Sequence, residues 1–500
     1  MNKKSAVLGI LMLVFNLHDA STAEAKDVLI VIDRRDATTM DPIAYEDSAS
    51  QRACRSLYDT LIYLDPLDGR ILPGLAESWE PLSDREYKFN LRKGVKFHNG
   101  DEMTAEDVRY SILRTKATPN LRTAAYSQNI QDVQAVDDYT VILRLENVDY
   151  SFFSSLSQSW SAIVSKKAVE EAGDAFAVNP VGTGPFKLVS WQKGYKYVLE
   201  RFEEYWGPKA KFRTLEVRSV PEPSNRMKEL SLGEADIVFP LTREDMKRVE
   251  RNWNLVLHRK PQTSILYLGF NCAKKPFDDV RVRRAISAAL DVEGIQAAIW
   301  NGVGETPRSL ISSAIRYSID SELKPHMQDV ELAKKLLAEA GVRNLKLEIW
   351  TSERRESIGM ATIIQSQIRE VGIAAEIRVL ERSAYLKGLK AQSHDLYLLC
   401  WTPPVPDPNF AVSELLETGA NSNYTFFSDK KLDELLNKGR SVPDGEERAA
   451  IYREIQLYIN EQSPMIYLQS GESLLGAQKY VKGIQASSSN AHSFREIYFE

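Results

Sequence analysis

Hydrophobic and polar residues alternate along this chain in short segments, and the period of the alternation changes from one part to the next. Residues 28–32 form a short apolar run, and residues 87–91 alternate apolar with polar, as expected for a buried and a half-exposed strand. Residues 186–191 and 195–202 flank a turn containing Gly194, which indicates a hairpin. The first part of the chain therefore predicts strands and hairpins with few helices.

The second part of the chain has a different pattern. Residues 345–349, 375–380 and 396–400 have the composition of strands, and Ile364, Ile368 and Val371 form a helical stripe that Gly372 closes. The order strand, helix, strand, helix, strand implies parallel crossovers and a mixed α/β fold.

Two segments follow directly after strands of this predicted parallel sheet. They are residues 351–355 and residues 401–407. Because ligands bind outside the carboxyl ends of parallel strands, we expect both segments to line a cleft.

The first 25 residues are expected to be a secretory signal peptide. Lys3 and Lys4 precede an apolar run over residues 6–15, and residues 23–25 form a small-x-small cleavage site. No cysteine lies near this site, so we expect a free periplasmic protein and no lipid anchor.

The bulk composition restricts the class of protein further. The remaining chain of about 475 residues exceeds a single core and predicts two or three lobes. The net charge is −5 with no basic block, which argues against a nucleic acid partner. Three cysteines do not make a disulfide framework.

Motifs for enzymatic chemistry are absent from the sequence. There is no HExxH, no Cys-x-x-Cys, no Walker A loop and no Gly-x-Ser-x-Gly elbow. We therefore expect neither an enzyme nor a cofactor or metal site, although a catalytic site assembled from distant residues stays open.

Several longer motifs occur in a fixed order along the chain. They are Leu-Ala-Glu-Ser-Trp at 75–79, Leu-Arg-Lys-Gly-Val-Lys-Phe at 91–97, Asn-Pro-Val-Gly-Thr-Gly-Pro-Phe at 179–186, Glu-Tyr-Trp at 204–206 and Pro-Phe-Asp-Asp-Val-Arg at 276–281. By these motifs the chain strongly resembles the extracellular solute-binding proteins of family 5. That family includes the oligopeptide-, dipeptide-, nickel- and glutathione-binding proteins of ABC importers.

The resemblance implies a periplasmic-binding-protein-like α/β fold, with two lobes joined by a hinge and a third lobe inserted (the class II, type C arrangement). The expected boundaries are residues 26–59, 181–267 and 477–500 for lobe I, 60–180 for lobe II and 268–476 for lobe III. The hinge is expected near residues 268–271 and 470–479.

The resemblance also implies candidate contacts with a solute. Trp401 matches a cleft tryptophan of peptide-binding members, in which an Asp three residues later pairs with the solute amine. Here that position is Pro404, which carries no charge, and Asp407 is the candidate substitute. A turn role before Pro408 is the alternative for Asp407.

Further candidates come from the other segments that border the cleft in such proteins. Arg354 and Arg355 could hold a solute carboxylate, or could be solvated loop charges. Tyr110 matches a pocket tyrosine of lobe II, with a core position as the alternative. Thr39, in the turn before lobe II, and Phe270, in the hinge segment, complete the set.

The expected function is a monomeric periplasmic receptor that carries a peptide or peptide-like solute to an ABC permease and its ATPase. Pro404 and the two arginines favour an N-blocked, modified or acidic solute. A nickel chelate or a sugar stays open within the same fold, and a hydrolase or a chaperone would be an alternative of another class. We further expect a disulfide between Cys272 and Cys400 at the rim of the cleft.

Overall fold

The computed structural model describes residues 26–65 and 68–500, and the expected signal peptide lies outside them. A mixed sheet is built from β1 (Val28–Asp33), β8 (Phe186–Gln192), β9 (Lys196–Arg201), β10 (Thr214–Ser219), β11 (Ile237–Val238), β12 (Leu255–Phe270), β13 (Lys346–Ser352), β14 (Ala374–Leu380), β15 (Leu396–Trp401) and β16 (Met465–Gln478). Its ten strands follow the order β14-β13-β15-β12-β16-β11-β1-β10-β9-β8.

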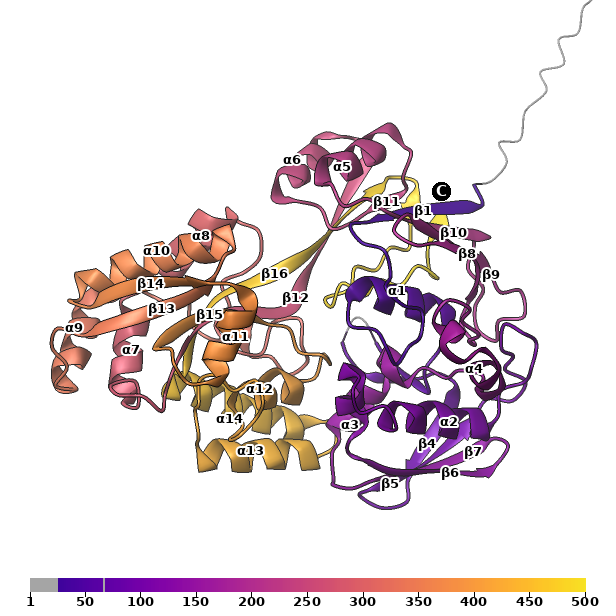
Figure 1. The fold of residues 1–500 in the computed structure, drawn as a ribbon, viewed down its shortest axis with the longest axis horizontal. Coiled ribbons are helices and arrows are strands. Elements are labelled where there is room, and N and C mark those ends of the chain that lie inside the picture. Colours follow the sequence, from indigo (N-terminus) through magenta and orange to yellow (C-terminus); the bar gives the residue numbers. More distant parts are fainter. Residues whose placement is uncertain (1–25, 66–67) are drawn as a thin grey trace, which may run out of the picture.

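Two long antiparallel strands, β12 and β16, connect the two ends of this sheet and form the crossing in the centre of Figure 1. Their register breaks between Pro261 and Ile265. From Ile265 onward β12 also pairs with β15, whereas the carboxyl end of β16 pairs with β11. The two strands therefore change their pairing partners at this break. It lies a few residues before the segment 268–271, near which the hinge was expected.

We call lobe I the part built on β11, β1, β10, β9 and β8. Strand β1 is parallel to both β10 and β11, and β8 and β9 form the predicted hairpin at Gly194. The other elements of lobe I are α1 (Ser48–Leu57), α5 (Pro223–Leu232), α6 (Arg243–Arg251), β17 (Val481–Lys482) and β18 (Tyr498–Phe499). Helix α4 (Lys166–Ala172), near the end of the expected lobe II segment, packs against the lobe I core. Two apolar clusters fill it, one around Leu29 and Phe186 and one around Leu230 and Val238.

We call lobe II the part built on a separate sheet of order β4-β5-β7-β6. Its elements are β2 (Ile62–Leu64), β3 (Ile71–Pro73), β4 (Ala76–Pro81), β5 (Glu86–Leu91), α2 (Ala105–Lys116), β6 (Ile130–Asp137), β7 (Thr140–Leu145) and α3 (Ser151–Leu156), with short 3₁₀ turns at Arg122–Ser127, Ser159–Ser161 and Gly173–Ala177. Phe89, Val108 and Trp160 belong to its own buried cluster. Lobe II thus has a core separate from that of lobe I.

We call lobe III the part built on β13, β14 and β15. Both β14 and β15 are parallel to β13, so the predicted crossovers are confirmed. Its helices are α7 (Val280–Ala288), α8 (Val292–Trp300), α9 (Val330–Glu339), α10 (Arg355–Glu370), α11 (Arg382–Lys390), α12 (Pro408–Leu416), α13 (Lys430–Ser441) and α14 (Glu446–Gln462), with a 3₁₀ turn at Asp320–Glu322. Gly372 follows α10 with φ +86°, as the sequence predicts.

The two faces of the lobe III sheet are covered by different helices. Ile349 and Leu268 pack with α7 to α10, whereas their neighbours Trp350 and Tyr267 pack with α11 to α14. This division follows from the strand itself, because successive side chains point to opposite faces. Because both faces are covered, β13 and β15 are largely buried, which explains their apolar runs, whereas the edge strand β14 stays partly exposed.

The predicted disulfide between Cys272 and Cys400 is wrong, because both thiols are free. Cys400 lies opposite Leu266 in the β12–β15 ladder, and Cys272 lies two residues beyond Phe270, at the other end of that ladder. Six residues of strand span about 20 Å, whereas a disulfide needs Cα atoms within about 7 Å.

Candidate functional site

Three of the predicted side chains meet at the carboxyl edge of the lobe III sheet. Arg354 and Arg355 follow β13, Trp401 ends β15, and these two strands are parallel neighbours. Neither guanidinium has a hydrogen bond or ion pair among the described residues, and both are exposed. The buried Nε1 of Trp401 also lacks a partner there. This edge therefore offers unused hydrogen-bond donors.

Lobe I contributes the loop that follows its parallel strand β1. Thr39 is half-buried in this loop, and its hydroxyl accepts a hydrogen bond from the Asp41 backbone at 3.1 Å. Arg34 and Arg35 come directly after β1 and were missed by the sequence analysis. The signal was present, because the rule that selected Arg354 also applies to the carboxyl end of residues 28–32.

The Asp407 carboxylate is already paired within the protein, unlike a carboxylate that is free to bind a solute. It is the N-cap of α12, and Arg448 holds it with Nη2 to Oδ1 at 2.9 Å and Nη1 to Oδ2 at 3.1 Å. The two side chains are 2% and 3% exposed. Burial opposes the charge on Arg448, yet the Asp407 carboxylate outweighs it and raises the pKa of Arg448. These contacts favour the alternative reading, a structural role before Pro408.

Asp407 also connects lobe III with lobe II. Ser154 of α3 donates its hydroxyl to the Asp407 carboxylate at 3.0 Å. The Tyr150 backbone N–H donates to the carbonyl of Arg440 at 2.7 Å. The two sides of the molecule therefore touch here as well as along β12 and β16 and where Arg243 of α6 donates to the Ile299 carbonyl of α8 at 3.2 Å.

The remaining two candidates do not join the edge formed by Trp401 and the arginines. Phe270 is fully buried in the lobe III core and pairs with Leu396, at the opposite end of β15 from Trp401. Tyr110 is half-buried on α2 and packs against the lobe I core. The position of Phe270 argues against contact with a solute, and Tyr110 stays a prediction.

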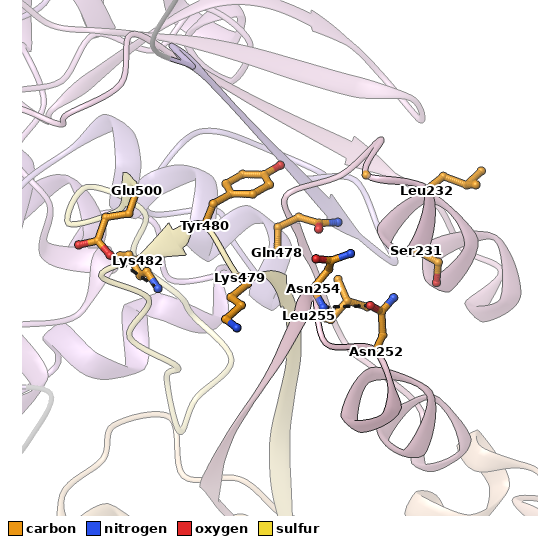
Figure 2. A pocket seen from close by; sticks show the side chains of 11 residues that line it. Ser231, Leu232, Asn252, Asn254, Leu255, Gln478, Lys479, Tyr480, Lys482 and Glu500 are labelled. Atoms are coloured by element: carbon orange, nitrogen blue, oxygen red, sulfur yellow. Dashed lines mark hydrogen bonds and ion pairs between the residues drawn. The ribbon is translucent and has the colours of Figure 1, made fainter. Parts of the chain in front are cut away.

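A pocket of about 570 Å³ lies elsewhere, on lobe I (Figure 2). It is bordered by the end of α5, the turn after α6, the end of β16 and the carboxyl terminus, with the lining residues Ser231, Leu232, Gly233, Asn252, Asn254, Leu255, Gln478, Lys479, Tyr480, Lys482 and Glu500. Lys482 pairs with Glu500 at 3.7 Å. The start of β12 and the end of β16 border this pocket, far along both strands from Trp401.

Neither a metal site nor a membrane span emerges from the part of the chain that the structure describes. Within residues 26–65 and 68–500, no three His, Cys, Asp or Glu side chains gather in a way that could hold a metal ion. In the same ranges, no helix has the length and apolar character to cross a membrane.

Comparisons with known proteins define the family. The model of the "Bacterial extracellular solute-binding proteins, family 5 Middle" matches residues 70–423. The chain is 28% identical to the dipeptide-binding protein of Escherichia coli, over 100% of this chain and 99% of that protein. It is 28% identical to heme-binding protein A of Haemophilus influenzae, covering 88% and 86%.

A solved structure agrees with these relatives. The ABC transporter-associated periplasmic binding protein DppA from Helicobacter pylori, in complex with peptide STSA, is 28% identical and has a TM-score of 0.77, covering 95% of this chain and 98% of that one. The chain belongs to the extracellular solute-binding proteins of family 5, and its periplasmic-binding-protein fold is confirmed.

Proposed function

We propose that this protein is a periplasmic receptor that captures a small peptide or peptide-like solute between lobes I and III and delivers it to an ABC permease. The observation that carries the proposal is that each of the two lobes has a carboxyl edge of parallel strands, and that the same pair of long strands joins the lobes. Arg34 and Arg35 end one, Arg354, Arg355 and Trp401 end the other, and β12 and β16 connect them. Such paired edges on hinged lobes suit a cleft that closes on its ligand.

We expect a solute that does not depend on a carboxylate of the protein to bind its amine. Pro404 occupies the position at which peptide-binding relatives carry the amine-binding Asp, and Asp407 is held by Arg448. A free α-amine would enter a poorly matched site, since a buried ammonium requires a paired charge. The proposal therefore favours an N-blocked, modified or acidic compound over an ordinary dipeptide.

We further propose the bounds of the three lobes and the role of the first residues. Lobe I comprises residues 26–59, 181 to about 262 and 471–500, lobe II residues 60–180, and lobe III the segment between the two crossings of β12 and β16. The register break between the pairs Pro261–Glu472 and Ile265–Ser470 motivates the shift of the two lobe I boundaries from the expected residues 267 and 477. Residues 1–25 direct export, and the exported chain acts as a monomer without catalysis.

Mass spectrometry of compounds released from the purified protein tests this function. The protein is purified under native conditions, denatured, and the extract compared with that of an unrelated exported protein treated identically. We expect one class of small solute, released chemically unchanged and rebinding to stripped protein with saturation. Conversion of the solute on incubation, or broad unsaturable binding of unfolded chains, would contradict the proposal.

A further inference from the structure

Lobe III meets the other lobes in two regions of the described chain. One is the crossing of β12 and β16, where α8 and the loop after it also reach α6 and β16. The other lies below it in Figure 1, where α3 of lobe II meets α12 and α13. A rigid body held in two places turns only about the line that joins them, so the second region restricts how lobe III can move.

Side chains of α3 and of the start of α12 form the closely fitted part of this second region. Ser154 donates its hydroxyl to the Asp407 carboxylate at 3.0 Å, and Asn409 Nδ2 donates to Ser151 Oγ at 3.4 Å. All four side chains are buried, so the two surfaces exclude water from their polar groups. We call these four residues the α3 contact.

The chemistry of the α3 contact suits a joint that turns without separating. A serine hydroxyl rotates to suit its partner, and a carboxylate accepts hydrogen bonds at both of its oxygens. Within the described residues, none of the buried apolar clusters combines side chains of lobe II with side chains of lobe III. The close interdigitation that would resist turning is therefore missing from this part of the chain.

One short segment connects the crossing with the α3 contact. It begins at Trp401, which pairs with Ile265 directly after the register break, and ends at Asp407. Six residues span at most about 22 Å when fully extended, so the two regions lie within that distance of each other. Three of the residues in between are prolines, namely Pro403, Pro404 and Pro406. Because a proline ring fixes φ, the segment is stiff.

We propose that lobe III closes by turning about an axis through the crossing of β12 and β16 and the α3 contact, with residues 401–407 spanning the axis. The inference rests on the proposed function, because it specifies how the receptor closes. Groups on the axis keep their neighbours, whereas the outer strand β14 moves furthest. Pro404 thereby gains a mechanical role at the position where peptide-binding relatives carry an Asp.

Distances between pairs of nitroxide labels, measured by double electron–electron resonance, test the axis. The contact pair, Asn147→Cys with Ser441→Cys, lies beside the α3 contact on lobes II and III. The edge pair, Lys193→Cys with Glu381→Cys, lies after β8 and β14, the two outermost strands of the ten-stranded sheet. All four positions are exposed, so labels there leave both cores intact.

Both pairs are placed in a chain that carries Cys272→Ser and Cys400→Ser, whereas Cys54 is buried and stays. The probe is the small-molecule extract released from natively purified protein. We expect the extract to shorten the edge distance and to leave the contact distance unchanged. Shifts of similar size in both pairs would overturn the axis and leave the closing receptor intact. If the extract binds and neither distance changes, closure and the axis are both contradicted.

A double variant, Ser151→Ala with Ser154→Ala, tests the α3 contact without any solute. We expect the spread of edge distances to widen, because lobe III then turns about the crossing with less restraint. Ser155→Ala is the matched control, since Ser155 is buried on the same helix and its hydroxyl has no partner among the described residues. Circular dichroism verifies that each variant folds. Equal spreads in the double variant, the control and the parent would overturn the proposal.

Discussion

Replacing Arg448 with methionine removes the positive half of a buried ion pair that links α14 to the start of α12. The two side chains are 3% and 2% exposed, and Arg448 donates to both oxygens of Asp407. Without the guanidinium, the hydrogen bonds that remain to Asp407 within the described residues come from Ser154 and the Asn409 backbone. A buried charge stripped of its partner costs about 3–5 kcal/mol, so we expect a loss of that size in the free energy of unfolding.

Urea unfolding followed by circular dichroism measures this loss, with the double variant Asp407→Asn, Arg448→Met as a second arm. In the double variant the unpaired carboxylate of Asp407 is replaced by a neutral amide, which should restore part of the stability. Arg453→Met is the matched control on the same helix, because the Arg453–Glu322 pair is about half exposed on both sides. An exposed pair contributes about 0–1 kcal/mol.

The reasoning is refuted if Arg448→Met and Arg453→Met destabilise equally. A loss below about 1 kcal/mol for Arg448→Met, in the range of an exposed pair, would have the same meaning. If Asp407→Asn weakens the affinity for solute without lowering stability, Asp407 contacts the solute after all.

Two further predictions concern buried titratable groups. Burial lowers the pKa of His98 and of His394 to about 4. Since the unfolded side chains bind protons below about pH 6.5, both should contribute stability that is complete above that pH and declines towards pH 4. Imidazole NMR resonances should keep their neutral positions down to about pH 4, and titration near 6.5 would contradict this. Unfolded in the absence of reductant, the protein should show three reactive thiols from Cys54, Cys272 and Cys400; a single thiol would mean that a disulfide exists.

The regular elements were readable from the sequence because their causes are local. The parallel arrangement of β13, β14 and β15 follows from strand and helix segments of sufficient length to cross over. The hairpin at Gly194 and the end of α10 at Gly372 follow from positive φ angles that glycine adopts readily. In each case a few neighbouring residues decide the outcome.

The site was less predictable because its decisive partners are distant in the chain. Arg448 lies 41 residues after Asp407, and no local pattern connects them. The register that separates Cys272 from Cys400 depends on how β12 pairs with β15. Arg34 is the exception, since its place after a parallel strand was visible and was not used.

Small-angle X-ray scattering of the full exported chain, with and without the solute recovered from it, tests closure most directly. The account predicts a smaller radius of gyration when the solute is present, and recovery of the same compound afterwards. Superimposable curves at solute concentrations that saturate binding in calorimetry would contradict it.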